Sequence, residues 1–124
     1  MGIDIQPIDE VKDSLAKFGD RYLKRLFSDL ELEECQISHE NLAGCLAVRF
    51  AAKEAVIKVL GPNDHIPSWR SIEVLLQPRG GPKIVMSGEA EQLARQNGVE
   101  RMLLSVSLGR DYGIATVVAD VTMS

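Results

Sequence analysis

The middle of the chain holds a long apolar segment that contains the charged run Arg49–Ala55 and stops at Gly61-Pro62, a pattern that predicts a central helix. At about 100° per residue, its apolar stripe consists of Leu46, Phe50, Ile57 and Leu60. Lys53 projects from the middle of this stripe, where a core-facing helix normally carries a hydrocarbon. Glu54 and Lys58 share the adjoining face with small alanines, so we expect a charged group to approach that face.

A purely structural interpretation explains the same charges. Glu54 and Lys58 form an i,i+4 pair, which stabilises a helix by about 0.2–0.5 kcal/mol without any ligand. Lys53 can lay its methylenes along the core and bring its ammonium to water. The helix by itself leaves both interpretations open.

Length, charge and cysteine usage exclude several classes of protein. The 124 residues suffice for one core, and we expect a single domain over residues 1–124. The net charge of −4 argues against a general nucleic-acid binder. No apolar run approaches the roughly 18 residues of a membrane span, and no signal-peptide pattern is present, so we expect no membrane partner and a cytoplasmic location. Cys35 and Cys45 lack metal-binding spacing, and we interpret them as packing residues rather than a disulfide.

A second helix, predicted over residues 8–27, has an apolar stripe opposite a basic ridge. The basic ridge consists of Lys17, Arg21, Lys24 and Arg25. Because acids occupy the other end of this helix, the bases also complement the helix macrodipole, which needs no partner. The ridge would equally suit an acidic protein surface or phosphates.

The order of the remaining elements predicts an α+β domain in which a small antiparallel sheet packs against the long central helix. A strand is expected at residues 2–5, an acidic turn or short helix at 29–34, and a helix at 89–96. Two hairpins are expected, with strands at 71–77 and 83–86 around a compact turn at 78–82, and at 102–107 and 113–121.

Two carboxylates interrupt apolar elements: Asp4 in the first strand and Glu54 in the central helix. Each is costly there unless it is paired or bound to a metal. If the two acids meet, a hard divalent cation would relieve their repulsion, and Mg²⁺ typically takes one or two protein carboxylates with phosphate oxygens and water. Lys53 and Lys58 would supply positive charge for such phosphates.

Several segments together resemble the holo-acyl-carrier-protein synthase family, the small 4′-phosphopantetheinyl transferases. The most specific part is Gly2-Ile3-Asp4-Ile5 combined with Arg49–Ala55 and Lys58. The resemblance continues in order through Arg21–Leu26, Trp69–Val74, Gly80-Gly81-Pro82, Ser87–Ala90 and Ser105–Val118.

The resemblance implies an enzyme that moves the 4′-phosphopantetheine arm of coenzyme A to a serine of an acidic apo acyl-carrier protein. The reaction would depend on Mg²⁺ and release adenosine 3′,5′-bisphosphate. The family works as a homotrimer with its sites at subunit interfaces, so a homotrimer is expected here.

The resemblance also assigns residues. Asp4 and Glu54 fall on the metal-ligand positions and, with Lys58, form the expected catalytic group. The expected coenzyme-binding residues are Arg49, Lys53, Lys58, Gly80, Gly81, Pro82 and Ser107. The expected carrier-binding residues are those of the basic ridge. Either Glu54 or a water held by the metal would accept the proton of the carrier serine.

Four positions depart from the family pattern. Leu108 replaces a histidine near the nucleotide end of the coenzyme, and Glu10 stands where many members have an arginine. Pro7 replaces a glutamate, and Gly81 stands where Lys or Gln is common. These changes are compatible with three kinds of protein. They are an enzyme dedicated to an unusual carrier, a slow general enzyme, and a catalytically silent homologue that binds carrier protein or nucleotide as a scaffold. We favour an active transferase because the metal and lysine positions are intact.

Overall fold

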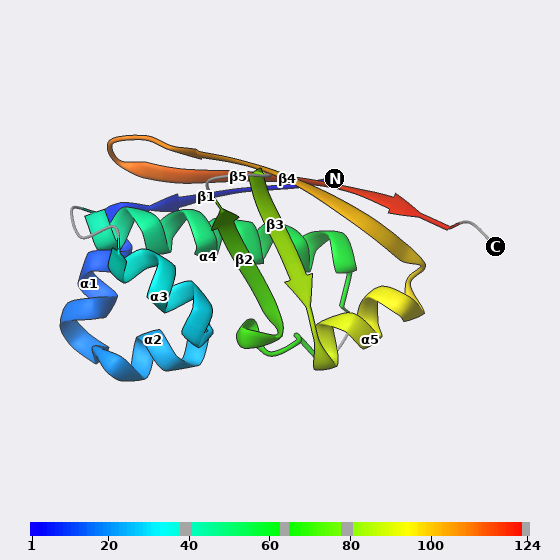
Figure 1. The fold of residues 1–124 in the computed structure, drawn as a ribbon, viewed down its shortest axis with the longest axis horizontal. Coiled ribbons are helices and arrows are strands. Elements are labelled where there is room, and N and C mark those ends of the chain that lie inside the picture. The colour runs from blue at the N-terminus through cyan, green and yellow to red at the C-terminus, as the bar shows by residue number, and fades with distance from the viewer. Residues whose placement is uncertain (38–40, 63–64, 78–80, 123–124) are drawn as a thin grey trace.

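The computed structural model describes residues 1–37, 41–62, 65–77 and 81–122, and its central element is the long helix α4 (Leu42–Leu60). Figure 1 shows the sheet of β1, β5 and β4 on one side of α4 and the helices α1, α2 and α5 on the other. The helices are α1 (Ile8–Phe18), α2 (Asp20–Leu26), α3 (Asp29–Ile37), α4, the 3-10 turn η2 (Trp69–Ser71) and α5 (Gly88–Gln96). The strands are β1 (Gly2–Pro7), β2 (Ile72–Gln77), β3 (Gly81–Met86), β4 (Val99–Leu108) and β5 (Tyr112–Val121). The predicted α+β class is confirmed.

The ends of α4 follow local sequence signals. The Asn41 side chain accepts a hydrogen bond from the Gly44 amide at 2.9 Å and caps the first turn. Gly61 ends the helix in the left-handed conformation, with φ 63°. The predicted end at Leu60 is therefore confirmed, and Gly61 supplies the backbone geometry that stops the helix.

The main sheet is antiparallel, with strand order β1-β5-β4, and its inner face lies directly on α4. Glycine allows this close approach: a Cβ on Gly113 would lie 2.8 Å from the Val48 amide nitrogen, and one on Gly2 would collide with the Ala55 carbonyl. Ala47 and Ala51 are fully buried beneath the sheet. The sheet backbone therefore covers the alanines that share a helix face with Glu54 and Lys58.

The other hairpin forms a sheet of its own, β2-β3, which runs across α4 and reaches β4 of the main sheet (Figure 1). The compact turn predicted over 78–82 ends earlier than expected, because Gly81 and Pro82 already belong to β3. There they pair with Gln77 and Leu76. Gly80 lies outside the described residues.

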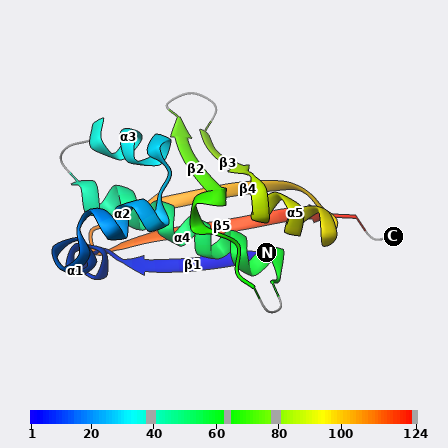
Figure 2. The same ribbon diagram turned by 90° about the horizontal axis from the view of Figure 1, so that it is seen from below.

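The predicted single helix over 8–27 is two helices, α1 and α2. Gly19 separates them with φ 52°, a conformation that a continuous helix cannot contain. Its amide still bonds to the Leu15 carbonyl at 3.0 Å, which closes α1 before the chain turns. Figure 2 shows α1, α2 and α3 gathered near the start of α4, while α5 lies near its end. In the described part of the chain, no helix combines the length and apolarity needed to cross a bilayer.

Candidate functional site

Asp4, Glu54 and Lys58 meet where β1 crosses α4. Lys58 Nζ donates to Asp4 Oδ1 at 2.9 Å and to the Ile3 carbonyl at 3.0 Å. The Asp4 side chain is 13% exposed and that of Lys58 is 54% exposed. The lysine therefore reaches across to the strand, and the simple i,i+4 pair with Glu54 is not the arrangement observed. Only the approach of β1 creates this contact.

Asp4 and Glu54 also contact one another directly. The pKa of Glu54 is raised to about 7, first by burial, then by its hydrogen bond to Asp4 and the Asp4 charge, while Lys58 opposes the rise. A protonated Glu54 can donate to the Asp4 carboxylate, which relieves the repulsion between the two acids. The juxtaposition expected from sequence is therefore present in the fold.

The two carboxyls offer a cation two protein ligands. Among the residues that the structure describes, no cluster of three or more His, Cys, Asp or Glu side chains could enclose a metal. Carboxylate oxygens with space left for phosphate and water suit Mg²⁺, which seldom occupies an all-protein cage. Glu10 lies close enough for its charge to raise the Glu54 pKa as well, so the surroundings are more acidic than two carboxyls alone. The residues present fit a magnesium ion.

Lys53 lies on the inner side of α4 and does not reach this site. Its side chain is 0% exposed, and its ammonium is 2.6 Å from Glu31 Oε1, 2.8 Å from the Trp69 carbonyl and 2.6 Å from the Ile72 carbonyl. The idea that its head group reaches water is wrong. Lys53 instead ties η2 and β2 to α4.

Arg49 is internal as well. Its side chain is 2% exposed, with Nη2 2.5 Å from Glu34 Oε1 and Nη1 2.9 Å from Cys45 Sγ. Direct contact of Arg49 or Lys53 with a coenzyme phosphate does not fit this burial. We therefore reassign both from coenzyme binding to internal ion pairing. Arg49 lies five residues and Lys53 one residue before Glu54, so nothing in the sequence indicated that they point to a different side of the helix. It did not show which side α3 covers.

Three further predicted coenzyme residues, Gly81, Pro82 and Ser107, lie elsewhere in the described part of the chain. Val106 and Asp4 are both register partners of Ala115, so Ser107, next along β4, has its side chain on the opposite face of the sheet. Gly81 is exposed in the other sheet. The fold of one chain does not bring these residues to Asp4 and Glu54.

The outer face of the main sheet carries large apolar side chains that the sequence analysis did not single out. The exposed members are Ile3, Ile5, Leu103, Tyr112, Ile114 and Val118. We call these residues the apolar sheet face. The sequence carried a signal for this face in β5, where the residues of both faces are largely apolar, a pattern typical of strands covered on both sides.

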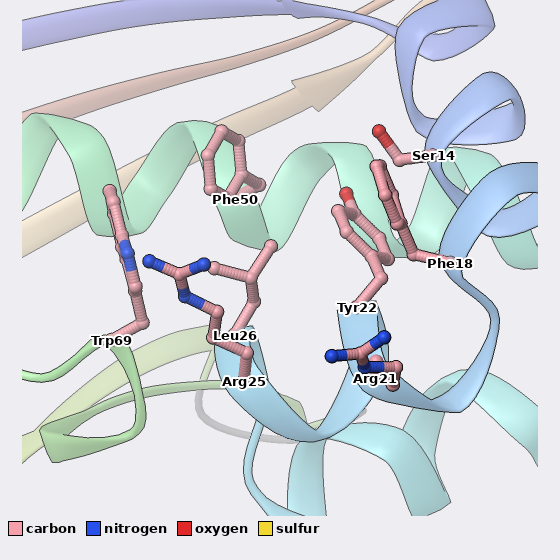
Figure 3. A pocket seen from close by; sticks show the side chains of 8 residues that line it. All are labelled: Ser14, Phe18, Arg21, Tyr22, Arg25, Leu26, Phe50 and Trp69. Atoms are coloured by element: carbon pink, nitrogen blue, oxygen red, sulfur yellow. The ribbon is translucent and has the colours of Figure 1, made fainter.

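A cavity of about 540 Å³ lies beside α2 and carries part of the basic ridge. Figure 3 shows its lining: Ser14, Phe18, Arg21, Tyr22, Arg25, Leu26, Phe50 and Trp69. The rings of Phe50 and Trp69 are 5.1 Å apart and form one wall. We call this feature the aromatic pocket.

The pocket and the carboxyl pair are neighbours along α4. Phe50 precedes Glu54 by four residues, so their side chains occupy adjacent turns of the same helix face. Arg21 and Arg25 line the pocket; Lys17 and Lys24 are exposed but do not line it. Lys17 belongs to α1 and the other three bases to α2, so the basic ridge does not lie on one continuous helix as predicted.

Comparison with known proteins identifies close relatives. The sequence matches the family model of the 4′-phosphopantetheinyl transferase superfamily over residues 1–117. Holo-[acyl-carrier-protein] synthase of Chlamydia trachomatis serovar D is 41% identical over 121 residues, covering 97% of this chain and 98% of that protein.

Solved structures agree with this result. Holo-[acyl-carrier-protein] synthase from Neisseria meningitidis superposes with a TM-score of 0.83 and 31% identity, covering 96% of this chain and 95% of the other. A Chronobacterium ammoniagenes ACPS–CoA complex gives a TM-score of 0.82 and 29% identity, covering 98% of this chain and 96% of the other.

Proposed function

The chain belongs to the holo-acyl-carrier-protein synthase family of the 4′-phosphopantetheinyl transferase superfamily, and from this premise we propose that it transfers 4′-phosphopantetheine from coenzyme A to a serine of an apo acyl-carrier protein. The observation that carries the proposal is the contact between Asp4 and Glu54 beside Lys58. A partly buried pair of acids has a stability cost, and a cation-assisted transfer to an alcohol gives a reason for keeping the pair.

Asp4 and Glu54 would hold Mg²⁺, which would neutralise charge on the pyrophosphate of coenzyme A during transfer. Lys58 is the cation left accessible at this site, and its ammonium can donate to phosphate oxygens next to Asp4. Glu10 replaces a basic residue of the family pattern, and its negative charge near Glu54 would attract a cation rather than oppose one.

Transfer requires the carrier serine to lose a proton while adenosine 3′,5′-bisphosphate leaves. The Glu54 carboxyl loses its own proton when a cation binds, and the resulting carboxylate is our choice for the acceptor. Asp4 lies beside that carboxyl and is itself held by the hydrogen bond from Lys58.

The acidic carrier protein would dock over α2. Arg21 and Arg25 place positive charge at the aromatic pocket, which can receive an apolar side chain of the partner. Lys17 and Lys24 extend the positive field around it, which speeds encounter with an acidic surface. Because Phe50 and Glu54 occupy successive turns, a partner seated here would bring its serine toward the carboxyl pair.

A homotrimer would cover the apolar sheet face. Isolated exposed apolar residues are ordinary, but this group is contiguous on three paired strands, as expected of a subunit interface. Burial against a second chain would also allow Ser107 of one subunit to take part in a site whose carboxyl pair comes from another.

The test is to incubate the protein with coenzyme A, Mg²⁺ and apo acyl-carrier protein, and to weigh the carrier by mass spectrometry. We expect the carrier to gain one phosphopantetheine, and to gain none when Mg²⁺ is chelated. The control carrier has its acceptor serine replaced by alanine.

A catalytically silent scaffold is the second candidate, because Leu108 replaces the family histidine at the exposed end of β4. Binding of coenzyme A and carrier without any mass gain, for carriers of several assembly pathways, would favour the scaffold over the transferase.

A further inference from the structure

The two cysteines of the chain lie together where α3 meets α4, away from the carboxyl pair. Cys35 is 0% exposed, and Cys45 is partly exposed. Both are free thiols of one packing cluster, in which Cys45 packs against the buried residues that include Cys35, and the two lie close enough for each to shift the pKa of the other. The sequence indicated packing residues, and the fold makes them neighbours.

The two thiols have unlike surroundings. Arg49 Nη1 lies 2.9 Å from Cys45 Sγ and also bonds to the Cys45 carbonyl at 3.3 Å, so a buried positive charge faces that sulfur. The hydrogen bond from Cys35 and then the Arg49 charge lower the Cys45 pKa to about 7, against burial and the Glu34 charge. The same hydrogen bond and burial raise the Cys35 pKa, with Glu31 adding to the rise and Arg49 opposing it.

The unlike surroundings give the two cysteines different roles: one reacts with an oxidant and the other closes the disulfide. A thiolate, not a thiol, is the nucleophile, and a cation beside a partly exposed sulfur is the usual setting of a reactive cysteine. Cys45 has that setting, and it is the sulfur that a small oxidant can reach. Cys35 is enclosed beside Cys45 and keeps its proton while Cys45 is a thiolate. After Cys45 is oxidised, Cys35 can attack that sulfur from within as its proton passes to the departing hydroxide.

We propose that Cys45 and Cys35 are a redox modification site, at which a hydroperoxide converts the two thiols into a reversible disulfide within one chain. The Cys45 thiolate attacks a peroxide oxygen, the O–O bond breaks, and hydroxide leaves to become water, giving a sulfenic acid on Cys45. The Cys35 sulfur then attacks the Cys45 sulfur, the S–O bond breaks, and a second water leaves with the Cys35 proton. In sum, two thiols and one hydrogen peroxide give one disulfide and two waters.

The bond would fasten α3 to α4 next to the Arg49–Glu34 ion pair. Glu34 also accepts a hydrogen bond from the Leu76 amide at 3.0 Å, so the cross-link would lie at a junction of α3, α4 and β2. The site involves none of Asp4, Glu54 and Lys58, so the proposal stands or falls independently of the transferase proposal.

The experiment exposes the reduced chain to hydrogen peroxide, without coenzyme A or carrier, and then unfolds it in N-ethylmaleimide. The untreated protein should take two labels. The treated protein should take none, should have lost two hydrogen atoms in mass, and should regain two labels after dithiothreitol. A proteolytic digest should yield one fragment pair joined through Cys35 and Cys45.

Single substitutions separate the two roles. In Cys35→Ser, peroxide should stop at a Cys45 sulfenic acid that dimedone traps, and Cys35→Ala repeats the test without placing a hydroxyl in the core. In Cys45→Ser, the remaining enclosed thiol should oxidise at least about tenfold more slowly than Cys45 of the wild type.

Three results would overturn the proposal. They are two labels remaining on the treated wild type, a disulfide that joins two chains on a non-reducing gel, or equal oxidation rates of the wild type and Cys45→Ser.

Discussion

Two sides of α4 carry charged residues of the same short motif and put them to opposite uses. On one side, Arg49 and Lys53 are enclosed and neutralised by the α3 acids Glu34 and Glu31. On the other side, Glu54 and Lys58 remain partly exposed and meet Asp4 of β1. The comparison shows that charge within a motif does not by itself indicate ligand binding. What separates the two sides is whether another element of the same chain supplies the counter-charge and excludes water.

The substitution Lys53→Met tests the enclosed side of α4 and has the largest expected effect. Removing the ammonium leaves Glu31 as an unpaired buried carboxylate, so we expect the free energy of unfolding to fall by about 3–5 kcal/mol. Denaturant unfolding followed by circular dichroism measures the change.

Two further variants control this result. Lys58→Met, on the exposed side, should change the unfolding free energy by less than about 1 kcal/mol. Glu31→Gln combined with Lys53→Met should recover part of the loss, because no unpaired charge then remains and the amide oxygen can still accept a buried backbone hydrogen bond that Glu31 accepts. A loss of transfer activity in Lys53→Met at unchanged stability would contradict the internal role of Lys53.

On the exposed side, Glu54→Gln should leave the fold intact, because the amide can still donate a hydrogen bond to Asp4. Transfer should nevertheless fall by about 100- to 1000-fold, since the variant lacks a charge at the proposed cation site. Single-turnover kinetics by mass spectrometry, with an unfolding curve on the same sample, gives both quantities. Turnover like that of the wild type would refute the role of Glu54.

The double substitution Arg21→Glu and Arg25→Glu tests whether the exposed side extends to the aromatic pocket. We expect KM for the carrier to rise by about 100-fold, because two attractive charges become repulsive, while coenzyme binding changes little. Titration calorimetry with each ligand separates the effects. Lys17→Glu is the matched control and should have a smaller effect, since Lys17 does not line the pocket.

The smallest expected effect is the pH dependence of Mg²⁺ binding. The proton on Glu54, whose pKa is about 7, must leave before both carboxylates can bind a cation. Affinity should therefore rise by about tenfold between pH 6 and pH 8 and level off above the pKa. Calorimetry at both pH values measures this rise, and Glu54→Gln should abolish it. Equal Mg²⁺ affinity at the two pH values would show that Glu54 does not bind the cation.

Local patterns predicted several elements well. The helix that ends at Gly61, the hairpin strands near 72–77 and 83–86 and the short helix before Asn97 all have strong signals close in sequence. The one-helix interpretation of residues 8–27 failed at Gly19, because its neighbours keep an uninterrupted helical pattern. Periodicity reports which faces are apolar, but it does not report a single backbone angle.

The candidate site divides in the same way. Asp4 and Glu54 were recognisable as acids out of place in apolar elements, and the structure brings them together. Arg49 and Lys53 were equally conspicuous, but their partners Glu34 and Glu31 lie in a segment that was predicted only as an acidic turn or short helix. Ion pairing between distant elements carries no periodic signature.

The sequence alone determined the family, the α+β class and the course of the central helix, because these depend on motif identity and on hydrophobic patterning over a few turns. The tertiary structure decided which charges are free, which sulfurs touch and which sheet face stays apolar and exposed. The physical reason is that burial and counter-charge depend on what packs against a residue. For the charged side chains of α4, the hydrogen-bonding partners on other elements lie between 15 and 55 positions away in the chain.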